Sequence, residues 1–534
     1  MEKINSRIKG GGKVLITTNS KYLKNSVFIF ISILMLFISS GCTRSTDNGT
    51  DTNKQTAKVT AKPKEEDVKQ ENLVITIDEN TVYQTIESFG ASGAWWSQDV
   101  GGWTSLTKDG IELREEIAKL LFDPTEGIGL SAYRYNIGAG SVESGSESGS
   151  KSGIIDAWRR AESFETESGV YDWTKDENAV WFLTKAKDMG VPELVFFCNS
   201  PPVRLTKNGK AYGDAAEGKS TSNLLEENYE AFANYVLDIT EHFISEGYPI
   251  KYVSPVNEPQ WDWTGGQEGC HYEPDELVKF LNVFLDVMEA RNIEGLELSA
   301  PELGEWGNTS YPYYEAILND KRLCDYLKSL DVHSYWSDIS AKSSFQKWIA
   351  QKAPKEFSLK TSEWCEMVNG MDLSMDSAIN LAMEINTDLT TLNVTSWQYW
   401  IAASCYSYRD GLIYVNTPGQ GMTVAKRLWA MGNFSRFIRP GYIRIECSSD
   451  SSDIHLSTYK GKDEKGTERI VLVLINQKDM EYKISTQNFG KWTNGSVYVT
   501  DKEHELEKTE EFTGTEKGIT IPSKSVVTIL LSEV

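Results

Sequence analysis

The sequence predicts an α/β fold, a (β/α)8 TIM barrel with a C-terminal side β-sandwich, and two observations support that prediction. Over residues 88–438, short apolar runs alternate with helix-like stretches, and eight alternations over roughly 350 residues have the size of such a barrel. Over residues 439–534, short β-rich runs are instead separated by turn residues, which is typical of a β-sandwich.

The N-terminal segment 1–41 is interpreted as a lipoprotein signal peptide. Lys21 and Lys24 precede an apolar stretch, 27–38, that is short for a membrane span, and small residues then lead to Cys42. This pattern resembles the bacterial lipoprotein signal, in which the cysteine is lipidated and becomes the new N-terminus. We therefore expect an extracellular protein anchored to the bacterial cell membrane through Cys42. An ordinary cleaved signal peptide or an uncleaved anchor is the alternative.

A tether and one strand are expected before the barrel. Residues 42–72 are rich in Thr, Lys, Asp, Glu and Asn and hold almost no large apolar residue, which is typical of a solvated linker. The apolar run 73–77 begins the folded part of the chain. It precedes all eight barrel runs, so residues 73–87 are expected to supply an N-terminal strand to the β-sandwich.

The barrel elements follow one another along residues 88–438. The strand-like runs are 88–96, 130–138, 193–198, 252–256, 296–301, 330–335, 357–363 and 395–401. The helix-like segments are 110–122, 177–189, 224–246, 274–291, 312–328, 344–351, 375–392 and 424–437. A doubly wound open sheet is the alternative, but it usually has a Gly-rich phosphate loop after its first strand, and residues 88–93 lack the G-x-G-x-x-G spacing.

The β-sandwich is expected from six short runs, 442–446, 454–459, 469–476, 482–485, 496–500 and 526–531. One Ser- and Gly-rich patch, 141–153, follows the second barrel run and is expected to form a loop on the same face as the site. A flexible insert is the simpler interpretation of this patch, and a contribution to the substrate cleft is the alternative.

Composition limits the function classes. The formal net charge of −23 disfavours nucleic acid and anionic membrane surfaces as partners. The 16 Trp and 24 Tyr suit a cleft for sugars, whose C–H faces pack on aromatic rings. Seven scattered cysteines and five histidines show no metal-ligand spacing, so no metal and no cofactor is predicted. The expected partner is a polysaccharide or oligosaccharide, and the expected state is a monomer.

Two glutamates are the candidate catalytic residues. Glu258 follows the fourth run, and Glu363 ends the seventh. Side chains at the C-terminal ends of barrel strands point into the mouth of the barrel, where active sites form. Two carboxyl groups, one ionised and one protonated, carry out glycoside hydrolysis. The sequence therefore predicts a glycosidase.

The motifs around these glutamates resemble a known family. Arg134–Gly138 (R-Y-N-I-G) and Ser254–Pro259 (S-P-V-N-E-P) resemble clan A glycoside hydrolases and, among them, glycoside hydrolase family 30. Asn257–Trp263, followed by Gln267–Cys270, is similar to the endo-β-1,6-galactanase branch of that family. The resemblance covers about residues 73–534 and includes the attached sandwich with its N-terminal strand.

The resemblance implies a role for each of five residues. Glu258 would be the general acid/base, and Glu363 the nucleophile. Asn257 would donate a hydrogen bond to the sugar 2-hydroxyl. Arg134 would lie beside Glu363 and help to keep it ionised, and Tyr335 would hydrogen-bond to it.

Several further residues lie at or just past strand ends. The tryptophans expected to line substrate subsites are Trp95, Trp96, Trp261, Trp263, Trp364 and Trp400. Trp397 and Trp400 are expected to face opposite sides of the eighth strand, with Trp400 toward the mouth. His333 is expected to be a core histidine with its hydrogen bonds satisfied. Glu302, Glu305 and Glu366 are expected to be subsite or loop residues.

The expected activity is retaining hydrolysis of an extracellular polysaccharide, with the β-1,6-galactan side chains of arabinogalactan as substrate. Hydrolysis of glucuronoxylan is the rival within the same family, because Arg409 could pair with a glucuronate, although Asp410 beside it could neutralise that charge. A rival from another class is a non-catalytic surface lipoprotein that binds glycans.

Overall fold

The computed structural model describes residues 71–144, 154–213, 215–216, 219–220, 222–463, 465–485, 489–514 and 518–533. The expected signal peptide, Cys42, residues 42–70 of the expected tether and residues 145–153 of the Ser/Gly-rich loop lie outside the described residues. None of the helices in these described ranges has the length and apolar character needed to span a membrane.

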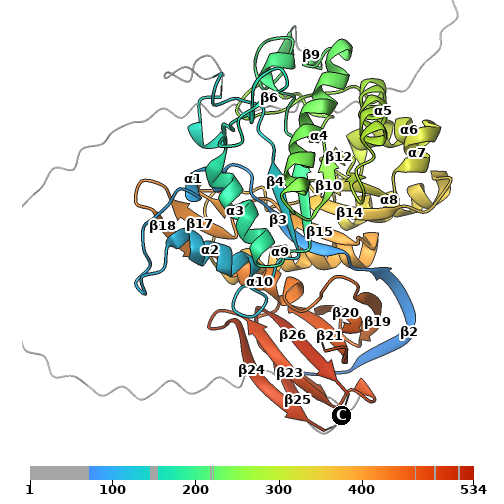
Figure 1. Ribbon diagram of the computed structural model, residues 1–534. Helices are drawn as coiled ribbons and strands as arrows, with labels where there is room; N and C mark the ends of the chain where they lie inside the picture. The colour runs from blue at the N-terminus through green and yellow to red at the C-terminus, as the bar shows by residue number, and fades with distance from the viewer. Residues whose placement is uncertain are drawn as a thin grey trace, which may run out of the picture. The chain divides into compact units, whose positions relative to one another are not determined.

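The barrel prediction is confirmed by a continuous parallel sheet (Figure 1). In spatial order its strands are β11 (Glu297–Leu298), β10 (Ile250–Ser254), β7 (Glu193–Phe197), β4 (Ala132–Asn136), β3 (Ser88–Ser92), β15 (Ser396–Tyr399), β14 (Ser358–Glu363), β13 (Ser329–His333) and β12 (Pro301–Leu303). The two end members, β11 and β12, are consecutive in the chain; β11 lies within the predicted run 296–301, and β12 begins at its last residue and extends to Leu303. Because β11 pairs with β10 and β12 pairs with β13, this fifth run closes the sheet into a barrel.

Helices surround the sheet, and all but the first overlap the segments predicted to be helical. They are α1 (Trp96–Val100), α2 (Leu113–Phe122), α3 (Glu177–Asp188), α4 (Tyr229–Ser245), α5 (Pro274–Arg291), α6 (Tyr311–Asn319), α7 (Lys321–Tyr326), α8 (Ile339–Lys352), α9 (Met375–Thr387) and α10 (Lys426–Ser435). The segment expected as one helix, 312–328, is two helices. Asp320 adopts an extended conformation and its side chain accepts a hydrogen bond from Leu323 N, so it ends α6 and caps α7.

The helix α5 shows why these segments fold as they do. Pro274 occupies its first turn, and Glu273 and Glu276 form a capping box that satisfies the free N–H groups there. Asn292 ends the helix in the left-handed conformation. The buried side chains recur at intervals of three and four residues, which places them on one face toward the sheet: Leu277, Phe280, Leu281, Phe284, Leu285 and Met288.

The C-terminal sandwich has two sheets. The larger is antiparallel, in the order β2 (Ile75–Thr85), β19 (Ile443–Ser449), β20 (Ile454–Lys462), β21 (Glu468–Asn476), β26 (Ser525–Ser532), β23 (Asn494–Thr500) and β24 (Glu505–Thr513). The smaller contains β1 (Glu71–Leu73), β22 (Tyr482–Ser485) and β25 (Gly518–Ile521). The expected N-terminal strand is confirmed, since β2 pairs with β19 and β1 pairs with β22 (Figure 1, blue beside orange).

Short strands occur in the loops of the barrel. They are β5 (Glu165–Glu167) with β6 (Val170–Tyr171), β8 (Ala215–Ala216) with β9 (Lys219–Ser220), and β16 (Ala403–Ser404) with β17 (Ile413–Asn416) and β18 (Gly421–Val424).

The last barrel helix, α10, packs against the sandwich. Asn433 Nδ2 donates to Thr528 Oγ1 at 3.0 Å, and that hydroxyl donates back to Asn433 O at 2.7 Å. Gly432 permits the close approach, because a Cβ at this position would lie 2.6 Å from Leu506 Cδ2. Buried apolar side chains of the sandwich, such as Val471 and Val526, therefore continue the core of the barrel.

Candidate active site

The barrel brings the two predicted glutamates together. Glu363 is the last residue of β14, and Glu258 lies four residues beyond the end of β10. Both are almost fully buried. One oxygen of each carboxylate and one ring nitrogen of His333 all lie within 4.8 Å of one another. This separation suits a retaining glycosidase, in which the carboxyl groups approach to about 5–5.5 Å, and leaves no room for the water of an inverting enzyme.

The backbone at Glu258 is held in an uncommon conformation. Its φ is 44°, in the left-handed region that residues with a Cβ rarely adopt. Its N–H donates to Glu302 O at 2.8 Å, and Trp263 Nε1 donates to Glu258 O at 3.0 Å. A Cβ at Gly304 would lie 2.8 Å from Glu258 Oε1. The strand-five loop and the Trp263 indole therefore fix the direction of the Glu258 carboxyl.

Glu363 lies among donors, as the family resemblance implied. Arg134 Nη1 donates to its Oε2 at 2.5 Å, and Tyr335 OH donates to its Oε1 at 3.1 Å. The pKa of the Glu363 carboxyl is raised, first by burial and also by the neighbouring Glu258, while His333 and Arg134 lower it. The donors favour charge on Glu363, because Arg134 and Tyr335 hydrogen-bond to this carboxylate.

His333 occupies the centre of the site. It is buried and its hydrogen bonds are satisfied, as expected, but its partners make it a functional candidate that the sequence argument missed. Nδ1 lies 3.1 Å from Glu258 Oε1 and 3.4 Å from Glu363 Oε1, and Nε2 lies 3.1 Å from Glu302 Oε2. Burial lowers the pKa of His333, but the surrounding carboxylates outweigh burial and raise it to about 10. His333 is therefore a cation at neutral pH.

A third buried carboxylate, Glu302, lies next to the pair. Burial raises its pKa, but Arg134 (3.3 Å), His333 and the Ser362 hydroxyl (2.6 Å) together lower it to about 2. The expectation of a subsite or loop residue is wrong for Glu302, because it is fully buried and ion-paired. Its position at the end of the fifth strand is the signal that could have found it, since Glu258 and Glu363 were predicted by that rule.

The other two acidic candidates lie in loops. Glu305 accepts hydrogen bonds from Thr309 N at 3.1 Å and from its Oγ1 at 2.6 Å. Glu366 accepts from Asn380 Nδ2 at 3.0 Å and from Arg409 Nη1 at 2.8 Å. Both bind protein groups away from the reacting pair.

Asn257 and Arg134 share one contact in the site. Arg134 Nη2 donates to Asn257 Oδ1 at 3.1 Å, and the guanidinium lies 3.8 Å from the centre of the Phe197 ring. Because Oδ1 accepts from Arg134, the amide nitrogen of Asn257 is the group that can donate to a substrate hydroxyl.

The predicted tryptophans differ in their contacts and in their exposure. Trp95 and Trp400 meet edge to face at 5.0 Å, and Trp400 approaches Phe197 at 6.5 Å, so this pair adjoins the Arg134 site. Trp261 meets Trp336 edge to face at 5.4 Å, and Trp336 is 58% exposed. Trp95 and Trp400 are buried, whereas Trp336 is exposed.

The remaining tryptophans have other positions. Trp96 was expected to line a subsite, and this is wrong: the side chain is fully buried, donates to Ser92 O at 2.9 Å and packs on Phe182 of α3. Trp263 is half-buried against Gly269. Trp364 is half-buried and approaches Trp397 at 6.1 Å. Trp397 donates to Asp388 in the helical layer, so it lies opposite Trp400, as expected.

Arg409 is held by partners other than the expected one. Its guanidinium pairs with Glu366 at 2.8 Å and with Asp372 at 3.5 Å. The expected competitor, Asp410, is buried and forms no ion pair with Arg409 among the described residues. Two carboxylates therefore already neutralise this cation.

The chemistry of the cluster does not suit a metal ion. At neutral pH, a histidine with a pKa of about 10 carries a proton on both ring nitrogens and offers no lone pair to a metal. The cationic Arg134 and His333 already balance the charge of Glu302 and Glu363. The arrangement is that of an acid/base pair on a charged hydrogen-bond network.

The fold and the paired carboxylates define the class: a glycosidase that hydrolyses O-glycosyl bonds. The family model described as O-Glycosyl hydrolase family 30 matches residues 72–414. The chain belongs to glycoside hydrolase family 30.

Three similar proteins illustrate this membership. An endo-β-1,6-galactanase of Hypocrea rufa is 24% identical over 428 residues, which are 76% of this chain and 81% of that protein. A glucuronoxylanase, XynC, of Bacillus subtilis strain 168 is 23% identical over 347 residues, 62% of this chain and 72% of that protein. The crystal structure of a conserved exported protein from Bacteroides fragilis matches with a TM-score of 0.75 and 26% identity, covering 86% of this chain and all of that one.

Proposed function

We propose that the protein is a retaining endo-β-1,6-galactanase that acts on arabinogalactan side chains outside the cell. The observation that carries the proposal is the close approach of Glu258 and Glu363, with Arg134 and Tyr335 donating to Glu363. Glu363 acts as the nucleophile, and Glu258 as the general acid and base.

The proposed reaction has two steps. Glu363 attacks the anomeric carbon and forms a glycosyl ester, while the proton of Glu258 passes to the leaving oxygen. The ionised Glu258 then takes a proton from water, whose oxygen attacks the same carbon and releases Glu363. Asn257 supports both steps by donating to the sugar 2-hydroxyl.

Three observations support a neutral galactan as substrate. The similar endo-β-1,6-galactanase matches 76% of this chain. Arg409, the cation that could bind a glucuronate, is already paired with Glu366 and Asp372. The Trp95–Trp400 and Trp261–Trp336 pairs supply apolar walls for a flexible β-1,6 chain.

A second candidate, hydrolysis of an acidic glycan such as glucuronoxylan, is favoured by Arg159 in the short 3₁₀ helix Ala157–Arg159. Its guanidinium lies 4.6 Å from the Trp95 ring and 5.0 Å from the Tyr406 ring, and its nearest carboxylate, on Asp156, is 3.9 Å away. This partly exposed cation beside Trp95 and Tyr406 could receive a sugar carboxylate.

A digestion panel tests the function. The purified chain is incubated with β-1,6-galactan, arabinogalactan and glucuronoxylan, with Glu363→Gln as the inactive control. We expect β-1,6-galactooligosaccharides and, by NMR, a first-formed product with retained β configuration. Efficient cleavage of glucuronoxylan that is lost in Arg159→Ala or Arg409→Ala would favour the second candidate. Binding of glycan with no product in any digest would favour a non-catalytic surface lipoprotein.

We further propose that Cys42 carries a lipid that anchors the enzyme outside the bacterial cell. The pattern of residues before Cys42 and the similarity to an exported protein of Bacteroides fragilis support this proposal. Mass spectrometry of the mature N-terminus tests it: a diacylglyceryl group on Cys42 is expected, and Cys42→Ser should release the protein. An unmodified chain that begins at another residue would contradict it.

A further inference from the structure

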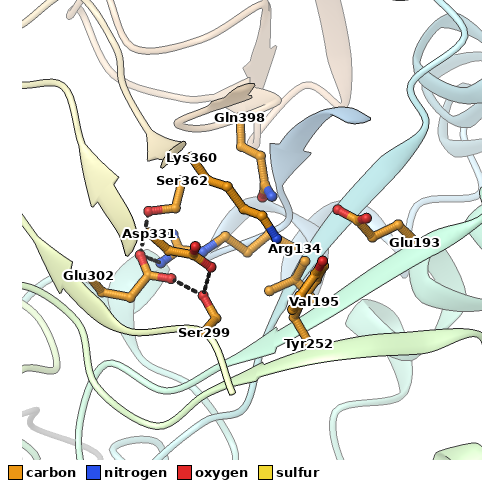
Figure 2. A pocket seen from close by; sticks show the side chains of 10 residues that line it. All are labelled: Arg134, Glu193, Val195, Tyr252, Ser299, Glu302, Asp331, Lys360, Ser362 and Gln398. Atoms are coloured by element: carbon orange, nitrogen blue, oxygen red, sulfur yellow. Dashed lines mark hydrogen bonds and ion pairs between the residues drawn. The ribbon is translucent and has the colours of Figure 1, made fainter. Parts of the chain in front are cut away.

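A small cavity lies inside the barrel next to the buried carboxylate network (Figure 2). Its volume is about 10 Å³, close to the least that can hold one water molecule. The lining residues that matter here are Arg134 and Glu302, which belong to the active-site network, and Ser299 and Asp331, which do not contact the catalytic pair.

Ser299 lies between two buried carboxyl groups, as Figure 2 shows. Its Oγ is 2.8 Å from Glu302 Oε1 and 2.5 Å from Asp331 Oδ2. A hydroxyl carries one proton and can donate to one acceptor at a time. When both carboxyls are ionised, Ser299 therefore serves either Glu302 or Asp331.

Charged and titratable groups of four other strands face Asp331 across the cavity: Arg134 of β4, Glu193 of β7, Tyr252 of β10 and Lys360 of β14. Burial raises the pKa of Asp331 to about 6, a rise that Glu302 supports and that Lys360, Ser299 and Ser329 oppose. Asp331 thus changes its charge near pH 6, while Glu302, with a pKa of about 2, stays ionised.

We propose that Asp331 and Ser299 form a two-state hydrogen-bond switch that positions charge on Glu302, and through His333 on the acid/base Glu258. In the ionised state of Asp331, Ser299 donates to Asp331. In its protonated state, the Asp331 hydroxyl donates to Ser299 Oγ, and Ser299 donates to Glu302. Asp331 gains one proton on passing from the ionised to the protonated state. The Ser299 hydroxyl keeps its proton and only changes its acceptor, from Asp331 to Glu302.

The direction of the effect follows from charge. Protonation of Asp331 removes a negative charge and adds a donor to Glu302, so Glu302 attracts the Nε2 proton of His333 less strongly. Ionisation of Asp331 has the opposite effect, so that Glu302 attracts the Nε2 proton of His333 more strongly. The switch therefore adds negative charge to the network around Glu258 as the pH rises above 6. The catalytic consequence rests on the proposed function, but the switch itself does not.

A measurement that needs no substrate tests the switch. The full chain is labelled with ¹⁵N-histidine, which marks five residues, and His333 is assigned by its loss in His333→Gln. We expect the His333 Nε2–H resonance to shift with a midpoint near pH 6, although His333 itself stays protonated. Asp331→Asn should abolish this pH-dependent step in the chemical shift, because the amide donates to Ser299 as the neutral carboxyl does.

Two more variants make the test specific. Ser299→Ala should reduce the step by half or more, because it removes the hydrogen-bond link. Glu193→Gln changes another buried carboxylate of the same cavity, hydrogen-bonded to Ser88 at 2.7 Å, and should leave the step intact. The switch would be overturned if the His333 Nε2–H chemical shift showed no step near pH 6. It would also be overturned if the step persisted in Asp331→Asn. These outcomes do not depend on which glycan the enzyme cleaves.

Activity supplies a second readout if hydrolysis is observed. Asp331→Asn should move the basic limb of the kcat/KM profile to lower pH by on the order of half a unit, with KM little changed. The same limb in Glu193→Gln should coincide with that of the wild type. An unshifted limb in Asp331→Asn would mean that the switch does not reach Glu258.

Discussion

At the scale of single residues, Arg134 joins the parts of the active site. It is fully buried and contacts Glu363, Glu302 and Asn257 with two terminal nitrogens. The planar guanidinium can bridge several acceptors at once, which the ammonium group of lysine cannot do in one geometry. The motif that carries Arg134 identified its location, but only the structure gives this set of three partners.

Substitution of Arg134 should therefore be costly. Arg134→Ala removes one of the two cations that contact the buried Glu302 and Glu363, so we expect a loss of about 3–5 kcal/mol in the free energy of unfolding and near-complete loss of activity. Arg322→Ala is the matched control, because Arg322 pairs with Asp286 and Glu289 on the exposed surface, where such pairs contribute about 0–1 kcal/mol. Denaturant unfolding of both variants measures the difference, and equal losses would contradict this account.

The two glutamates should respond differently to rescue. Glu363→Gln should abolish turnover but keep sugar binding. Glu258→Ala should lose about 10²–10⁴-fold with natural substrates and recover with substrates whose leaving group needs no proton, or with azide. Rate measurements with an aryl glycoside decide this. Azide rescue of Glu363→Ala with retained configuration would reverse the two assignments.

The stability of the network should depend on pH in a defined direction. The pKa of His333 is about 10 in the folded state and ~6.5 in an unfolded chain, so its charge stabilises the fold fully below pH ~6.5 and ceases to do so as the pH rises through 10. His333→Asn should therefore lose more stability at pH 6 than at pH 10. Urea unfolding at both values is the measurement.

Glu302→Gln tests a pH dependence of stability with the opposite sign. The pKa of Glu302 is about 2 when folded, so its contribution is present above pH ~4.3 and is lost as the pH falls through 2. The stability difference from the wild type should therefore shrink toward acid. A difference independent of pH would show that the charge of Glu302 is not what stabilises the fold.

The sequence located part of the site, and the reason for the limit is geometric. Strand-end position and local motif predicted Glu258, Glu363 and Arg134. His333 was missed as a functional residue because its role comes from partners on other strands, Glu258 and Glu302, and no local pattern encodes such contacts. Trp96 was misplaced because the chain turns into α1 after β3 and directs this ring toward α3.

At the scale of elements, the alternation of apolar runs and helical stretches predicted the barrel, and local capping decided the details. The predicted helix 274–291 coincides with α5, because Pro274 and Asn292 mark its two ends. The predicted helix 312–328 is divided because Asp320 prefers to cap a new helix. The fifth run is interrupted at Ser299 and Ala300, where its two halves pair with opposite neighbours.

The contact between α10 and the sandwich yields a further prediction. Alanine normally favours a helix over glycine by about 1 kcal/mol, but Gly432→Ala would place a Cβ 2.6 Å from Leu506 and 2.9 Å from Ile128. We therefore expect a loss of about 1–3 kcal/mol from overpacking. Gly421→Ala, where a Cβ would meet nothing within 4 Å, should change stability by less than about 0.5 kcal/mol. A stabilised Gly432→Ala would contradict the close packing.

At the scale of the whole molecule, the two ends of the described chain meet in the sandwich. The strand β2 forms the edge of the larger sheet, and β1 pairs with β22 in the smaller one. Removal of residues 71–85 should therefore expose the backbone edge of β19 and promote aggregation. A chain that begins at Glu71 is the control and should stay monodisperse by light scattering. A monodisperse, active chain that lacks residues 71–85 would show that these strands are dispensable.

The pairing of β2 with β19 also sets an order of events during synthesis. Ile75 emerges from the ribosome early, but its partner Ser449 is made only after the whole barrel has been translated. The strand β2 therefore stays unpaired with β19 while the barrel is translated. If translation stops within the barrel, the incomplete chain lacks β19. The unpaired edge of β2 is then exposed, and chaperones and proteases can recognise it. The pairing of β2 with β19 can therefore form only once the barrel between them has been translated.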